Sequence, residues 1–218
     1  MAPLSQVAQS LRVTGTGGAA MTKETCTFRT ASAEDAEALV DLILMAGDGL
    51  PEYLWQLMAE PGEDLRSVGR RRARRDEGGF SWRNALVAET PEKHVIAGLL
   101  GYPLPDVPEP VELDSLPAPV RPLVALEQRV PGSWYINVVA TRPEWRRQGL
   151  AQRLMKEAER QAHATGRQAL SLIVSSDRHA ARALYEAQGF SIVATLPKHA
   201  DGPVLGGADW VLYAKLLP

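Results

Sequence analysis

The sequence is poor in the residues that build several common kinds of site. It has one cysteine, Cys26, so no internal disulfide can form, and its four histidines are scattered at His94, His163, His179 and His199. A zinc site needs clustered ligands at short spacings, and none are present. The 24 basic side chains nearly cancel the 26 acidic ones, so overall charge does not favour nucleic acid as a partner. We therefore expect a cytoplasmic protein that holds no metal ion.

Long hydrophobic runs are missing as well. The longest apolar stretch, around residues 39–45, is interrupted by Asp41 and is far shorter than the roughly 18 to 20 residues that cross a bilayer. The first twenty residues carry one charge, Arg12, and are too polar for a secretory signal. We expect no membrane association, a disordered extension over residues 1–20, and a single domain over residues 21–218.

Hydrophobic periodicity becomes regular after Met21 and alternates between the strand and helix periods. Seven prolines between Pro103 and Pro122 predict an irregular insertion. Strands are predicted at 25–30, 85–88, 95–102, 134–141, 169–174, 190–195 and 210–216, the second and third as an antiparallel hairpin. Helices are predicted from Ser32 to Ala46, with a capping-box-like start at Ser32 and Asp35, and at 51–59, 65–75, 120–128, 149–165 and 179–188.

One turn between a strand and a helix carries the strongest chemical signal. The segment from Arg146 to Ala151 reads Arg-Arg-Gln-Gly-Leu-Ala, which brings positive charge and small residues to the start of a helix. Unpaired N–H groups and the positive end of the helix dipole favour an anion there. The turn therefore predicts a phosphate site, although neither G-x-x-x-x-G-K-[ST] nor G-x-G-x-x-G is present.

Two motifs resemble those of the GNAT superfamily of N-acetyltransferases. Arg146-x-x-Gly149-x-Ala151 is similar to its acetyl-CoA motif, Q/R-x-x-G-x-G/A, and the segment from Ala181 to Phe190 is similar to its A-x-x-L-Y-E-x-x-G-F signature. The resemblance extends over about residues 26–217. It implies an α/β (α+β) fold with a mixed, largely antiparallel sheet of six or seven strands and helices on both faces. It also implies a central strand pair that splays apart near Asn137 and Leu172.

The resemblance also implies roles for individual residues. The main chain of Val139, Ala140 and Thr141 would bind the pantetheine arm of acetyl-CoA, and Tyr185 would protonate the departing thiolate. The pyrophosphate would be wrapped by the turn and the helix start, at Arg146, Arg147, Gln148, Gly149, Leu150, Ala151 and Gln152. The alternative, which has less weight once the resemblance is considered, is that Tyr185 is a core aromatic on an amphipathic helix with Ala181 and Leu184.

Three positions depart from the family pattern. Arg178 stands where many members have a cofactor-binding Asn; it could contact the cofactor by its guanidinium or face solvent. Ile173 and Asn137 occupy the places where members often carry an acid. No general base is therefore visible, and a water relay or an acid from the variable N-terminal half would have to deprotonate the amine.

The acceptor side is less well defined by sequence. Asp48, Glu52, Tyr53 and Trp55 combine carboxylates and aromatics that could cage a cationic amine, with Asn137 as a further acceptor contact. The alternative is that the two aromatics pack in the core and the acids are solvated. The arginines between residues 66 and 75 are interpreted as a solvated helix face, because no stacking aromatics are interleaved with them.

The leading functional prediction is an N-acetyltransferase that moves an acetyl group from acetyl-CoA to an amine, with a small molecule favoured over a protein N-terminus. The insertion and the helices around residues 48–75 look able to cover an open groove. The alternative is a non-catalytic module that binds or senses acyl-CoA. The missing base favours this alternative, and Tyr185 argues against it.

Overall fold

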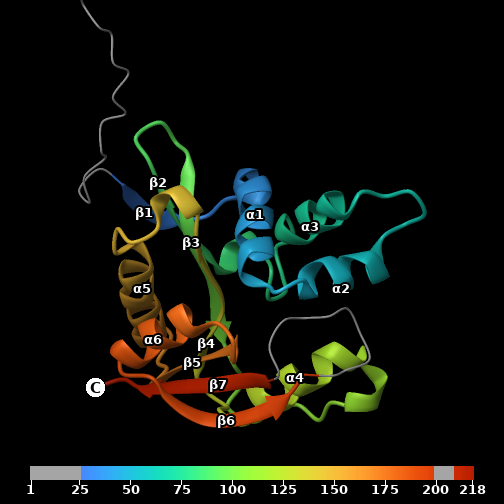
Figure 1. Cartoon of the computed structure of the whole chain (residues 1–218), viewed down its shortest axis with the longest axis vertical. Helices are drawn as coiled ribbons and strands as arrows, with labels where there is room; N and C mark the ends of the chain where they lie inside the picture. The colour runs from blue at the N-terminus through green and yellow to red at the C-terminus, as the bar shows by residue number, and fades with distance from the viewer. Residues whose placement is uncertain (1–25, 199–208) are drawn as a thin grey trace, which may run out of the picture.

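The computed structural model describes residues 26–198 and 209–218, so the predicted extension over residues 1–20 lies outside the described part. The described residues form one seven-stranded sheet in the order β1-β2-β3-β4-β5-β7-β6 (Figure 1). Neighbouring strands are antiparallel except β4 and β5, which are parallel. The predicted sheet is thereby confirmed. The strands are β1 (Thr27–Thr30), β2 (Ala85–Glu89), β3 (Val95–Pro103), β4 (Trp134–Thr141), β5 (Ala169–Ser175), β6 (Ser191–Pro197) and β7 (Asp209–Leu216).

The helices lie where the periodicity predicts them, with ends that shift by a few residues. The helix predicted from Ser32 opens as a 3-10 turn, and the Ser32 N–H donates to the Asp35 carboxylate at 2.7 Å, as in a capping box. Within residues 26–198 and 209–218, no helix is long and apolar enough to cross a bilayer. The helices are α1 (Ala36–Ala46), α2 (Leu50–Met58), α3 (Leu65–Ala73), α4 (Arg121–Glu127), α5 (Leu150–Ala164) and α6 (His179–Ala187).

Helices cover both faces of the sheet. Figure 1 shows α5 and α6 on one side and α1, α2 and α3 on the other. Beneath α5, Leu154 and Met155 are fully buried against strand residues such as Leu99 and Leu172. On the opposite face α1 packs on a second core that includes Leu100. Burying a large aliphatic side chain contributes about 1.5–3 kcal/mol, so these two cores fix the helices that border the site.

A β-bulge in β4 changes which face its side chains reach. Trp134 and Ile136 belong to the core under α5, whereas Val138 and Ala140 belong to the core under α1. Strict alternation would place all four on one face. On β3, consecutive residues pair with Ile136 and with Val138, so Asn137 is the extra residue between them. Bulges of this kind re-aim side chains next to active sites.

The parallel strands β4 and β5 pair only at their beginnings. The last matched residues are Ile136 and Leu172. Beyond them β4 continues to Thr141 along β3, and β5 continues to Ser175 along β7. The two strands therefore part at the bulge, as predicted, and among the described residues no strand pairs with the second half of the β4 edge that faces β5.

Candidate functional site

Three connected hollows follow the opening between β4 and β5. A groove of about 550 Å³ runs past the start of α5, and it shares Met45, Val139 and Ala181 with a central cleft. The cleft shares Asn137, Ile173 and further residues with a cavity of about 200 Å³ between α2, α4 and the sheet. A ligand could therefore extend from the groove, past the splay, to the mouth of the cavity.

The groove collects most of the residues predicted to bind a cofactor. Gln148 does not line it, and Arg178 lies in the central cleft instead. The predicted residues that do line it are Val139, Ala140, Thr141, Arg146, Arg147, Gly149, Leu150, Ala151 and Gln152.

The turn before α5 has the backbone geometry of an anion site. Arg147 and Gly149 adopt left-handed conformations, with φ of 63° and 79°, and Gly149 is the residue before the helix begins. When residues of a turn adopt left-handed conformations, successive backbone N–H groups can point toward the same spot. The first N–H groups of a helix also lack an acceptor within the helix. The Arg146 Nε donates to the Thr141 carbonyl at 3.2 Å, which ties the turn to β4. Backbone donors and the helix dipole together suit a phosphate group.

Tyr185 lies in the central cleft. Tyr185 is 6% exposed. The centre of its ring lies 6.1 Å from the centre of the Phe190 ring and 6.2 Å from that of the Tyr213 ring. No described residue hydrogen-bonds its hydroxyl, unlike the Tyr213 hydroxyl, which accepts from Arg182 and donates to Glu186. Burial raises the pKa of Tyr185 to about 12, so the hydroxyl keeps its proton at neutral pH. The cleft therefore contains a buried proton donor that makes no hydrogen bond to any residue the structure describes.

Arg178 also lines the central cleft, where it pairs with Asp48. It stands at the start of α6, and its Nε donates to Asp48 Oδ1 at 2.6 Å in the turn between α1 and α2. Asp48 is nearly buried, with 7% of its side chain exposed, whereas half of the Arg178 side chain is exposed. The guanidinium is therefore engaged by a buried carboxylate while half of the side chain faces solvent, and its contact with a cofactor stays a prediction.

The cavity receives only part of the predicted acceptor cage. Trp55 and Asn137 line it, but Glu52 and Tyr53 do not. The period of α2 explains this correction, because the cavity is lined by Leu50, Pro51, Leu54 and Trp55 of this helix, whereas Glu52 and Tyr53 between them lie off that face. Asp48 belongs to the central cleft and is neutralised there by Arg178.

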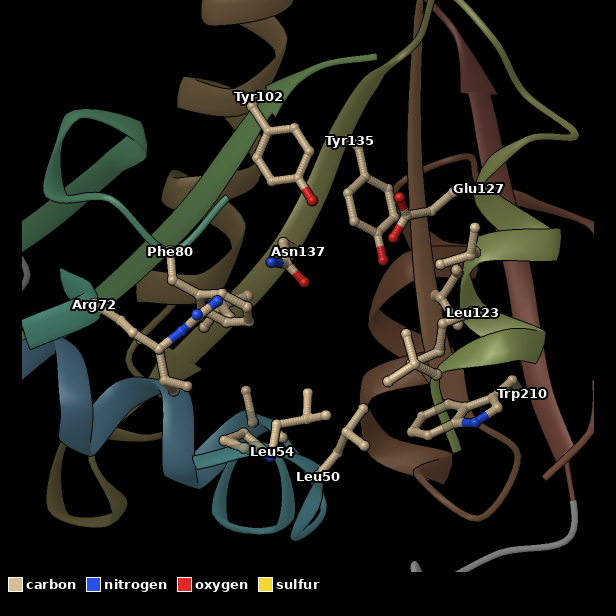
Figure 2. A pocket seen from close by; sticks show the side chains of 18 of the residues that line it. Leu50, Leu54, Arg72, Phe80, Tyr102, Leu123, Glu127, Tyr135, Asn137 and Trp210 are labelled. Atoms are coloured by element: carbon tan, nitrogen blue, oxygen red, sulfur yellow. The ribbon is translucent and has the colours of Figure 1, made fainter. Parts of the chain in front are cut away.

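The structure adds a carboxylate that the sequence interpretation missed. Glu127, at the end of α4, lines the cavity, and burial raises its pKa to about 7 although the Tyr135 hydroxyl lowers it as a hydrogen-bond donor. Figure 2 shows Glu127 beside Tyr135 of β4, with Asn137 of the same strand and Tyr102 of β3 close by. The available signal was an acid that continues the apolar stripe of Leu123 and Val124 at helical spacing.

Comparisons with solved structures show the same fold at low sequence identity. Arylalkylamine N-acetyltransferase 2 from Aedes aegypti matches 88% of this chain and 99% of its own, with TM-score 0.62 and 12% identity. A polyamine N-acetyltransferase from Drosophila melanogaster matches 88% and 100%, with TM-score 0.59 and 18% identity. Ard1 from Thermoplasma volcanium matches 89% and 99%, with TM-score 0.56 and 15% identity.

No curated protein sequence matches the chain. The sequence profile of the acetyltransferase (GNAT) family, however, matches residues 52–190, which is more than half of the chain. This range contains the turn before α5, the splayed strands and Tyr185. The chain belongs to the acetyltransferase (GNAT) family.

Proposed function

We propose that this chain is an N-acetyltransferase that moves the acetyl group of acetyl-CoA to the amine of a small molecule. The observation that carries the proposal is the Tyr185 hydroxyl. It has no hydrogen bond to a described residue, and it lies in the cleft that joins a groove with anion-binding geometry to an apolar cavity. A protonated phenol at this junction suits a reaction in which a thiolate leaves.

The groove fits the donor. Backbone N–H groups at Gly149 and the following residues would hold the pyrophosphate, with Arg146 and Arg147 adding positive charge. The unpaired edge of β4 at Val139 to Thr141 would bind the amide groups of the pantetheine arm as an added strand does. These contacts would point the thioester toward the splay.

The transfer needs little covalent help from the protein. An amine nitrogen held in the cavity mouth bonds to the acetyl carbon, the carbon–sulfur bond breaks, and Tyr185 gives its proton to the departing sulfur. Main-chain dipoles at the splay would stabilise the negative oxygen that forms on the way. Holding the amine and the thioester together supplies much of the acceleration.

The shape of the cavity favours a small acceptor. It is bounded by Leu50 and Leu54 of α2, by Leu123 of α4 and by Trp210 of β7, and its volume is about 200 Å³. Figure 2 shows these side chains facing one another across the space. The proline-rich segment leads directly into α4, so it would help to close this wall.

Thiol release tests the proposal against the non-catalytic alternative. Acetyl-CoA is incubated with the protein and a panel of primary amines, free thiol is measured, and the N-acetylated product is identified by mass spectrometry. We expect thiol release that depends on the amine and matches the product in amount. Tight binding of acetyl-CoA without either product would favour a binding or sensing module.

Arg178 is expected to contribute to donor binding, because its guanidinium forks can reach a carbonyl or phosphate oxygen from the cleft. Arg178→Ala should raise the KM for acetyl-CoA several-fold with little change in the KM for the amine. Asp48→Asn is the matched control, since it removes the ion pair and leaves the guanidinium in place. Equal changes in the KM for acetyl-CoA and the KM for the amine, or no change in either, would contradict a contact between Arg178 and the cofactor.

A further inference from the structure

The cavity contains one carboxylate, that of Glu127, among the described residues that line it. No described cation pairs with this carboxylate, and its interaction is with the Tyr135 hydroxyl. A partly buried carboxylate without a counter-ion is disfavoured unless a ligand supplies the opposite charge. The rest of this wall is apolar, with Leu123 and Val124 on the same helix.

The opposite end of the cavity carries a cation. Arg72 lines it and stacks with its guanidinium carbon 5.5 Å from the centre of the Phe80 ring, while Nη1 lies 3.2 Å from the sulfur of Met58. No described carboxylate pairs with it. Figure 2 shows Arg72 and Phe80 on one side of the space and Glu127 on the other. The cavity therefore has a carboxylate at one end and a guanidinium at the other.

We propose that Glu127 binds the amine of the acceptor and removes its proton, and that the cavity selects an apolar monoamine over a diamine or polyamine. The proposal rests on the proposed function and extends it to the base and to the acceptor class. Asn137 and Ile173, which line both the cavity and the central cleft, connect the Glu127 end to the position of the thioester.

The protons balance as follows. The acceptor enters as an ammonium ion and gives one proton to the Glu127 carboxylate, which leaves a neutral nitrogen able to attack. After the new carbon–nitrogen bond forms, the nitrogen loses a second proton, which replaces the one that Tyr185 gives to the leaving sulfur. Glu127 then releases its proton to solvent. The net products are the amide, the free thiol of CoA and one proton.

The surroundings of Glu127 make its ionisation the step that responds to pH. The titratable groups that face it are Tyr102 and Tyr135, whose pKa values are raised by burial, so both stay neutral. The strands β6 and β7 present apolar residues to α4, and Arg72 lies across the cavity. The carboxyl group, with its pKa raised to about 7, is protonated at lower pH and cannot then accept a proton. Transfer should therefore weaken as pH falls through about 7.

The selectivity follows from the same charges. An apolar body can pack against Leu50, Leu54 and Trp210 while its single ammonium group meets Glu127. A second ammonium group at the far end would approach Arg72, a like charge in a poorly solvated place, which costs binding free energy. The cavity offers that second group no carboxylate among the described residues.

The first experiment measures kcat/KM for phenethylamine between pH 5.5 and 9.5. Glu127→Gln should lower it about 10²-fold or more at pH 7.5, in the range of general base catalysis. In the wild type, kcat/KM should rise with pH near 7. In Glu127→Gln this rise should be absent, and kcat/KM should instead follow the fraction of amine that is unprotonated in solution. Glu109→Gln, which removes an exposed carboxylate that does not line the cavity, is the matched control and should behave as wild type. An unchanged profile in Glu127→Gln would overturn the proposed base.

A binding measurement separates this proposal from the proposed function. Calorimetry with CoA present should show that phenethylamine binds at least 10-fold more weakly to Glu127→Gln than to the wild type. 1,4-Diaminobutane should bind the wild type at least 10-fold more weakly than phenethylamine, and Arg72→Gln should narrow that difference. Binding lost in Glu127→Gln without any transfer by the wild type would uphold the Glu127 site and refute the transferase. If the wild type binds neither amine, or prefers the diamine, the proposed acceptor site is wrong.

Discussion

Replacing Tyr185 with phenylalanine is expected to lower kcat for acetyl transfer by about 10²- to 10⁴-fold, the range typical of general acid catalysis. The substitution removes one oxygen atom that makes no hydrogen bond to a described residue, and it leaves the ring packed against Phe190 and Tyr213. The affinity for acetyl-CoA and the melting temperature should therefore stay nearly unchanged. Steady-state kinetics, calorimetry and thermal unfolding of the same preparations check the three quantities.

Tyr213→Phe provides the matched control. The Tyr213 hydroxyl accepts from Arg182 Nε at 3.0 Å and donates to Glu186 Oε1 at 2.6 Å, so its loss should destabilise the fold by about 1 kcal/mol or more without a selective rate defect. If Tyr185→Phe behaves like this control, its hydroxyl has a structural role. A rate loss well below about 10²-fold would mean that the thiolate obtains its proton from water.

Replacing Gly149 with glutamate is expected to abolish measurable binding of CoA while the protein still folds. The residue has φ of 79° at the start of α5, where a side chain is strained and where a carboxylate would meet the site of the pyrophosphate. Losing two or three charge-assisted hydrogen bonds, each worth about 1.5–3 kcal/mol, corresponds to a decrease in affinity of at least about 10²-fold. Calorimetric titration with CoA measures the effect, and circular dichroism verifies the fold.

The same helix supplies a control for the strain and the charge. Gly166 follows α5 at its other end, has φ of 71°, and has no atom within 4 Å of the place that a Cβ would occupy. Gly166→Glu therefore adds the same side chain to the same backbone conformation far from the groove. Equal losses of affinity in both variants would attribute the effect to general damage, and an unchanged affinity in Gly149→Glu would show that the phosphate turn is misassigned.

The fold was largely predictable because its signals are local. The apolar period of 3.6 in α5 and the continuous apolar runs of β2 and β3 depend on neighbouring residues, and the motif from Arg146 to Ala151 lies within one turn. The predicted β4 matches the observed Trp134–Thr141 at both ends. The donor groove was predictable for the same reason, since most of its residues come from two adjacent segments of the chain.

The acceptor side was less predictable because it is assembled from distant segments. Asp48 and Arg178 are 130 positions apart, and only the folded chain places them together. Glu127 lies on a short helix after an irregular segment, and its helical spacing to Leu123 and Val124 was a weak local sign that it faces inward. Glu52 and Tyr53 have suitable chemistry, but the phase of α2 turns them away from the cavity. Long-range contact is set by tertiary packing, which periodicity does not encode.

The extra residue at Asn137 makes this part of the protein sensitive to insertion and deletion more than to substitution. Because successive side chains of a strand point to opposite faces, removing one residue here would exchange the faces reached by all four residues that follow. Val138 and Ala140 would leave the core under α1, and Val139 would leave the wall of the groove. The side chain at position 137 can therefore vary with the acceptor, whereas the number of residues in β4 must be preserved.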